Sequence, residues 1–232
     1  MKKLYLILFF FLYNAILFAQ IYEIGVFGGG TNVIGDVGST TFVAPQKLAI
    51  GGLFRWNRSP RHSFRASVIY TSMYADDRRS TDPRREQRGF FFNAKVLEVS
   101  AGMEFTFLDF DLHKKEFNFS PYIYSGISLL NHPNFFFQSN RTLRSENTRS
   151  NAFGIPISLG LKLTLNEYLL FGVEIAARYT FSDEIDGSIP DTEELIETVR
   201  FGNINNNDWY IFSGFTLTYT FGRNPCFCSY LK

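Results

Sequence analysis

The chain has 232 residues, of which 45% are hydrophobic and 18% aromatic, including 27 phenylalanines. Its formal net charge of +1 is too small for a nucleic-acid-binding protein, which would carry a basic surface. This length is enough for one sizeable domain.

The N-terminus has the pattern of a secretory signal peptide. Lys2 and Lys3 precede an uncharged apolar run over residues 4–18, and Ala19 follows as a plausible cleavage point. A membrane anchor helix is the alternative, but the run is shorter than the roughly 20 apolar residues that a spanning helix needs. We therefore predict a cleaved signal peptide over residues 1–19.

Residues 168–181 alternate between an apolar and a mixed register. The apolar register contains Leu169, Phe171, Val173, Ile175, Ala177, Tyr179 and Phe181. The other contains Tyr168, Leu170, Gly172, Glu174, Ala176, Arg178 and Thr180. A membrane-spanning strand needs about 9–11 residues when it is tilted. The length and the pattern favour a strand with one face on lipid and the other in a narrow lumen.

Segments of this kind recur along the chain. They cover residues 22–30, 48–56, 62–75, 90–107, 119–130, 153–165, 168–181 and 208–221. The predicted fold is all-β: a transmembrane up-and-down barrel of about eight antiparallel strands over residues 20–221. The aromatic surplus is then expected in girdles at the two membrane interfaces.

The inward registers of these segments carry charges of both signs. They are Glu23, Arg55, Arg65, Glu98, Glu104, Lys162, Glu174 and Arg178. A narrow barrel is filled by side chains, and buried charges must be paired to be tolerated. We therefore predict ion pairs in the barrel lumen rather than an ion-conducting pore.

The lengths of the connections predict the orientation of the barrel. The first, third, fifth and seventh connections are long, whereas the even ones cover only residues 57–61, 108–118 and 166–167. Outer-membrane barrels have short periplasmic turns and longer loops outside the cell. Both termini are therefore expected in the periplasm, and the protein in the outer membrane.

Two of the long connections are rich in charge. Residues 76–88 mix arginines with acids, which favours a solvated, internally paired loop over a clamp for lipopolysaccharide phosphates. Residues 183–197 are acidic, but their spacing fits no EF-hand, so no metal site is predicted. Residues 192–199 are expected to form a short helical turn capped by Thr192.

Catalytic patterns are weak. Of the three histidines, only His132, in a predicted outer loop with Ser139 or Ser145 nearby, resembles part of a hydrolytic site at the barrel rim. His62 and His113 belong to predicted periplasmic turns. No catalytic residue, cofactor or small-molecule substrate is predicted.

The residues after the last strand, 222–232, form a predicted periplasmic extension. It contains Cys226 and Cys228, the only cysteines of the chain. The two are close enough in sequence to bridge each other only in a strained ring. Free thiols, or a disulfide to another chain in the oxidising periplasm, are the alternatives. We expect the extension to contact a periplasmic partner.

Several segments together resemble a known family. They are GVFGGGTNVIGD from residue 25, AIGGLFRWNRSPRHSFRA from residue 49, EVSAGMEF from residue 98, SPYIYSGIS from residue 120 and NDWYIFSGFTLTYTFGRNPCFC from residue 207. In this order they resemble the PorG family of outer-membrane proteins of the type IX secretion system. The matches extend over nearly all of the chain after the predicted signal peptide.

The resemblance implies a non-enzymatic barrel that serves protein export or gliding. Its implied partners are outer-membrane lipid and a periplasmic ring of a lipoprotein and its companion, of the PorK and PorN type. Cys226 and Cys228 match the closing cysteine pair of the family and would face that ring. Asn32, Gly35 and Asp36 match a first-loop pattern to which we assign no role. A stand-alone barrel, either a small pore or a surface-binding protein, is the alternative, and a lipid-modifying enzyme is a weaker one.

Overall fold

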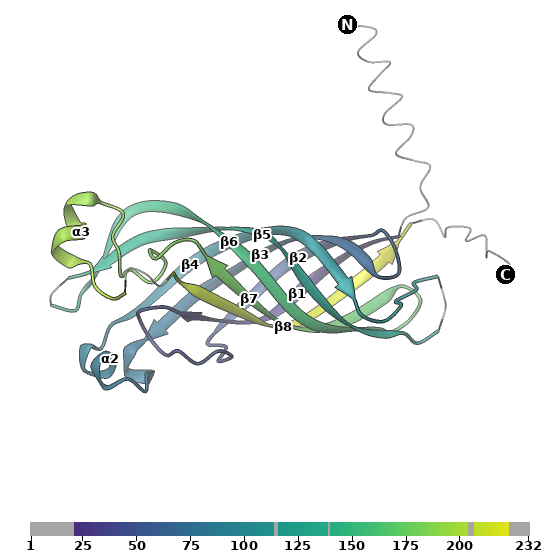
Figure 1. The fold of residues 1–232 in the computed structure, drawn as a ribbon, viewed down its shortest axis with the longest axis horizontal. Coiled ribbons are helices and arrows are strands. Elements are labelled where there is room, and N and C mark those ends of the chain that lie inside the picture. The colour runs from purple at the N-terminus through teal and green to yellow at the C-terminus, as the bar shows by residue number, and fades with distance from the viewer. Residues whose placement is uncertain (1–20, 114–115, 139, 204–206, 223–232) are drawn as a thin grey trace, which may run out of the picture.

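A computed structural model describes residues 21–113, 116–138, 140–203 and 207–222. Eight strands form a closed antiparallel barrel in sequence order, which confirms the predicted fold class (Figure 1). The strands are β1 (Ile21–Ile34), β2 (Lys47–Asn57), β3 (His62–Asp76), β4 (Phe91–Thr106), β5 (Phe119–Phe137), β6 (Leu143–Thr164), β7 (Leu169–Thr180) and β8 (Trp209–Phe221). The predicted signal peptide, Cys226 and Cys228 lie outside the described residues.

The sheet closes where β1 pairs with β8. Tyr22 lies opposite Phe221 at one end of this ladder, and Ile34 lies opposite Trp209 at the other. We call the first end, where β1 begins and β8 finishes, the terminal end. The opposite end, which carries the connections β1–β2, β3–β4, β5–β6 and β7–β8, is called the loop end.

Side chains alternate between the lumen and the outer surface as the sequence predicts. On β7, Val173 and Ile175 are exposed, whereas Glu174 and Arg178 between and beside them are buried. The predicted apolar registers of β2, β4 and β6 also face outward. The outer surface of the barrel is therefore an apolar belt.

The height of this belt matches a bilayer. On β4 the outward apolar positions extend from Leu97 to Phe107, just after the strand. Ten residues of a tilted strand span about 25 Å, close to the apolar band of membrane barrels. Beyond Leu97, the outward positions of the same strand are the exposed Lys95 and Asn93.

Aromatic rings gather at both edges of the belt. At the terminal end, the Trp56 ring lies 5.4 Å from that of Phe64, centroid to centroid. Toward the loop end, Tyr179 lies 4.9 Å from Trp209 and 5.4 Å from Phe181. This is the girdle arrangement that membrane interfaces favour.

The hairpin of β5 and β6 is longer than the sequence predicted. The strands were expected to end at residue 130 and to begin at residue 153, but they continue to Phe137 and start at Leu143. The fifth connection is consequently short. The lipid-facing pattern on which the prediction relied stops near Asn131, where the hairpin leaves the apolar belt. Backbone pairing continues beyond it, with a register shift between Pro133 and Phe135.

Three short helical segments lie in the loop-end connections: η1 (Asp77–Arg79), α2 (Pro83–Arg88) and α3 (Glu193–Val199). The predicted helix at residues 192–199 is confirmed as α3, with Thr192 at its N-cap position. The Thr192 hydroxyl donates to Glu146 Oε2 instead of accepting from the helix. None of the helices in the described part of the chain is long and apolar enough to cross a membrane.

We predict that Met103→Arg lowers the free energy of unfolding by about 2–4 kcal/mol, because Met103 is exposed near mid-height of the belt. The matched control is Asn93→Arg, on the same face of the same strand but beyond the belt, and should cost less than about 1 kcal/mol. Urea unfolding in lipid bilayers measures both. Equal costs for the two variants would contradict the assignment of the belt.

Candidate functional site

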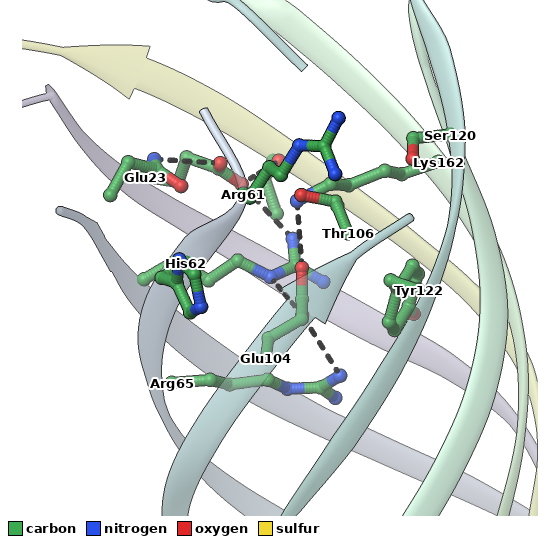
Figure 2. Close-up of polar contacts among 12 residues, drawn as sticks. Glu23, Arg61, His62, Arg65, Glu104, Thr106, Ser120, Tyr122 and Lys162 are labelled. Atoms are coloured by element: carbon green, nitrogen blue, oxygen red, sulfur yellow. Dashed lines mark hydrogen bonds and ion pairs between the residues drawn. The ribbon is translucent and has the colours of Figure 1, made fainter. Parts of the chain in front are cut away.

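All eight charges predicted for the lumen are buried inside the barrel, and each lies within ion-pair distance of an opposite charge. Figure 2 shows the part of this network nearest the terminal end. Four of the residues are acidic and four are basic, so their formal charges cancel. The charges come from β1, β2, β3, β4, β6 and β7.

Glu104 is the centre of the network. Its carboxylate lies 2.9 Å from Arg55 Nε, 2.8 Å from Lys162 Nζ and 3.9 Å from Arg65 Nη1. Arg55 and Arg65 stand directly opposite each other on β2 and β3. Two like charges in this position repel, and the carboxylate of Glu104, within ion-pair distance of both, offsets that repulsion.

Two further carboxylates complete this layer. Glu23 accepts from Arg55 Nη1 at 3.0 Å, and Glu174 accepts from both terminal nitrogens of Arg65 at 2.6 and 2.8 Å. The Tyr122 hydroxyl donates to Glu174 at 2.5 Å. The bidentate geometry fixes the guanidinium of Arg65 in the plane of its partner.

A second layer lies closer to the loop end. Arg178 Nε is 3.1 Å from both carboxylate oxygens of Glu98, and the Tyr210 hydroxyl donates to Glu98 at 2.7 Å. The interior also contains buried apolar side chains that include Phe27, Met73, Phe92, Leu130 and Phe212. The lumen is therefore packed along its length rather than open to water.

The structure does not bring His132 and Ser145 together. His132 lies within β5 rather than in a loop, and its side chain is 1% exposed, so the prediction of a loop position was wrong. Its strand continues beyond the apolar belt, and the sequence pattern did not show this. Ser145 is exposed and lies opposite Phe135, three residues away from His132 along β5. Ser139 lies outside the described residues.

The other two histidines lie at the terminal end, where they were expected. His62 begins β3, and its Nδ1 lies 3.2 Å from the Ser59 hydroxyl. His113 follows β4 in the next terminal-end connection. Among the described residues, no hydrogen bond joins the His62 ring to an acid, so the contact between Ser59 and His62 is a turn contact.

The arginine-rich connection between β3 and β4 is internally paired. Arg78 binds Asp76 at 2.8 Å, and Arg88 binds Asp77 at 2.8 Å. Arg85 donates to the backbone carbonyl of Gly38 in the β1–β2 connection. These contacts join the two connections. The guanidinium groups bind carboxylates and a backbone carbonyl of the same chain.

Four aspartates meet at the loop end, which the sequence analysis did not anticipate. They are Asp36, Asp183, Asp186 and Asp208, from the β1–β2 and β7–β8 connections. Burial and the nearby carboxylates of Asp186, Asp36 and Glu184 raise the pKa of Asp183 from 3.8 to about 7. Within the described residues, no three His, Cys, Asp or Glu side chains form a metal-binding group.

The terminal end has a cleft of about 400 Å³ between two connections. It is lined by Ser59, Pro60, Arg61, His62, Asp109 and Asp111. Arg61 and Asp109 form an exposed ion pair across it. Phe117, in the same connection as Asp109, and Leu165, in the β6–β7 connection, are 70% and 56% exposed. This surface therefore offers both charged and apolar groups.

The closed sheet, the apolar belt and the filled lumen define a small eight-stranded β-barrel of the type found in outer membranes. The chain belongs to the family described as Domain of unknown function (DUF6089), whose model matches residues 2–230. None of the curated proteins matches it in sequence.

Solved structures with a similar course of the chain include small surface barrels. One is Ail, the attachment invasion locus protein of Yersinia pestis, at 10% identity, with a TM-score of 0.46 and coverage of 88% of this chain and 100% of Ail. Neisserial surface protein A has 10% identity, a TM-score of 0.45, and coverage of 88% and 98%. OprG from Pseudomonas aeruginosa has 12% identity, a TM-score of 0.43, and coverage of 88% and 96%. These low values carry no inference about function.

Glu104→Gln should lower the free energy of unfolding by about 3–5 kcal/mol, because it leaves buried cations without their shared carboxylate. The control is Glu116→Gln, the same substitution at an exposed position of the terminal end, which should change stability by less than about 0.5 kcal/mol. Denaturant unfolding in bilayers measures both. A small effect of Glu104→Gln would show that the network is not needed for stability.

The filled lumen also predicts that the barrel does not conduct ions. Reconstituted into planar bilayers, the protein should show no steady ion current at about 100 mV, because ion-pair layers and apolar side chains occupy the interior. Reproducible single-channel steps would contradict this prediction, provided that they are absent from bilayers treated with the detergent alone.

Proposed function

We propose that this protein is a non-enzymatic outer-membrane β-barrel component of the type IX protein secretion and gliding machinery, associating with a periplasmic ring of PorK- and PorN-type subunits. The observation that carries the proposal is the packed lumen. A barrel whose interior is occupied by paired charges and apolar side chains offers no path for a substrate, so its function belongs to its two ends and to its anchoring in the membrane. The resemblance of several segments, in order, to the PorG family is the reason for proposing the type IX secretion machinery in particular.

The terminal end is the periplasmic end in this proposal. The connections at the loop end include the longest of the chain, and membrane barrels carry their longer loops outside the cell. Loop and terminal ends then face the outside and the periplasm, respectively. The lumen charges need no role beyond structure, and nucleic acid and small molecules are not among the partners.

The contact surface for the ring is the terminal end together with the C-terminal extension. β8 finishes at Phe221 at this end, so the extension begins at the same end of the barrel as the connections that carry Arg61 and Phe117. Cys226 and Cys228 lie in this extension and match the closing cysteine pair of the family. In the oxidising periplasm, one of them is available for a disulfide to a ring subunit.

The proposal predicts that deletion of residues 223–232 leaves the barrel assembled but abolishes co-purification with the PorK- and PorN-type proteins and stops type IX export. Barrel assembly is measured by the heat-dependent shift on electrophoresis, and export by the substrates released into the medium. Purification without reductant, followed by a non-reducing gel, tests whether Cys226 or Cys228 is bonded to a partner.

The matched control alters the opposite end of the same barrel. Replacing α3, an exposed seven-residue helix of the loop end, with a Gly-Ser linker of equal length should leave ring binding and export intact. Normal export by the deletion variant would overturn the ring-anchor proposal. Loss of export in both variants would indicate a general assembly defect, and the electrophoretic assay would then show it directly.

A stand-alone surface-binding barrel is the second candidate, favoured by one observation. The loop-end connections hold one another through contacts such as Arg88 to Asp36 O and Asp186 to the Val37 amide, and such an ordered surface suits recognition outside the cell. A small pore is disfavoured by the packed lumen, and a rim enzyme by the burial of His132. Unchanged export after the terminal deletion would favour this second candidate.

A further inference from the structure

The first and last loop-end connections meet at four aspartates. Asp36 lies in the β1–β2 connection, Asp183 and Asp186 lie in the β7–β8 connection, and Asp208 directly precedes β8. We call these four residues the carboxyl junction. Three of them hold backbone amides across or within the two connections, so they decide how the connections fit together.

Asp186 joins the two connections directly. Its Oδ2 accepts from the backbone amides of Asp36 at 2.5 Å and Val37 at 3.1 Å, about 150 residues away in sequence. In return, Asp36 Oδ2 accepts from the Asn203 amide at 2.8 Å. The closed arrangement of the connections therefore depends on these carboxyl groups remaining in place.

Gly35 shows how tightly the junction is packed. A Cβ atom at this position would collide with Asp208 Oδ1 and with Asp186 Oδ2. The two oxygens therefore lie beside the same backbone atom and close to each other. Asp208 uses its other oxygen, Oδ2, to accept from the amides of Ile185 and Asp186.

Several carboxyl oxygens in the junction have no hydrogen-bond partner. Asp208 is completely buried, and its Oδ1 accepts from no donor among the described residues. Asp183 is 8% exposed, and neither of its carboxyl oxygens has a partner. An ionised carboxylate that is buried without donors or a counter-charge is strongly unfavourable, so this environment favours the protonated form of both side chains.

The surrounding charged groups do not supply that counter-charge. Arg85 and Arg88 reach the junction, but they donate to the backbone carbonyls of Gly35 and Asp36. Arg88 pairs with the carboxylate of Asp77, and Glu184 adds a further acid beside Asp183. Among the described residues, no ion pair joins Arg or Lys to any of the four junction carboxyls.

We propose that the carboxyl junction is a proton-dependent latch: it closes the first and last loop-end connections onto each other when Asp183 and Asp208 are neutral, and it releases them when both carry charge. This inference concerns the loop end and does not depend on the proposed secretion role. If the latch operates, the conformation of the exposed surface formed by the two connections changes with pH.

The direction of the pH dependence follows from burial. Desolvation and the neighbouring carboxylates raise the pKa of Asp183 to about 7, and desolvation raises the pKa of Asp186 and Asp208. A carboxyl whose pKa is raised in the closed state binds its proton more tightly there than in the open state. The contribution of Asp183 to closure is therefore complete below its ordinary pKa of 3.8 and is lost as the pH rises through about 7.

The test measures the distance between the two connections by pulsed electron–electron double resonance. Spin labels are attached at Thr40→Cys and Glu197→Cys, both at exposed positions, in a full-length chain that carries Cys226→Ser and Cys228→Ser. Spectra are recorded in bilayers containing EDTA between about pH 5 and about pH 9. We expect one short, narrow distance in acid and its loss, with a midpoint near pH 7, as the pH rises.

Three variants make the result specific. Asp183→Asn and Asp208→Asn are neutral and nearly isosteric, so each should keep the short distance at a pH at which the parent chain has lost it. The matched control, Glu193→Gln, removes an exposed charge from the same connection and should keep the parental midpoint. The heat-dependent electrophoretic shift confirms that each variant forms the barrel.

Three outcomes would overturn the latch. The first is a distance that does not change between acid and alkaline pH. The second is opening of the two Asn variants at the same pH as the parent chain. The third is recovery of the short distance at alkaline pH on addition of Ca²⁺ alone, which would assign the junction to a divalent cation instead of protons.

Discussion

Closure of the sheet between β1 and β8 is the constraint on which the rest of this structure depends. A strand edge that faces hydrocarbon leaves amides and carbonyls unpaired, at a cost of several kcal/mol for each group. The ladder from Tyr22 opposite Phe221 to Ile34 opposite Trp209 removes that edge. Closure also creates an interior, and in an eight-stranded barrel that interior is only wide enough for side chains.

The ion-pair network follows from that narrow interior. Every inward charge has to find its partner across the lumen, and Arg55, Arg65 and Lys162 converge on Glu104 from three different strands. Hydrophobic residues of similar volume would often stabilise a protein as well as buried ion pairs do. Charged pairs add a requirement for register, because a one-residue slip of β2 or β3 would turn Arg55 or Arg65 toward lipid.

Because the lumen is filled, the surfaces at the two ends of the barrel are the ones to consider for function. The loop end is a built surface, in which three connections hold one another through arginine-to-carbonyl and carboxyl-to-amide contacts. The terminal end carries the short β2–β3 and β6–β7 connections, a cleft with the Arg61–Asp109 ion pair, and exposed apolar side chains such as Phe117. One end is thus shaped by its own polar contacts, whereas the other presents groups available to another molecule.

The amino-acid sequence by itself determined the barrel and its inward charges. Alternation over residues such as 168–181 identifies which face of a strand meets lipid, because the two faces of a spanning strand meet different solvents. The same alternation identified Glu104 and the seven other lumen charges, since each lies in an inward register. It did not say which acid meets which base, because partners such as Arg65 and Glu174 are 109 residues apart.

Only the tertiary structure decided what lies beyond the apolar belt. In water, both faces of a hairpin tolerate polar residues, so the pattern that reveals a spanning strand disappears although backbone pairing continues. For this reason the sequence did not show the extension of β5 through His132. It also did not bring Asp36 beside Asp186 and Asp208, because that contact arises when closure of the barrel places the first and last connections side by side.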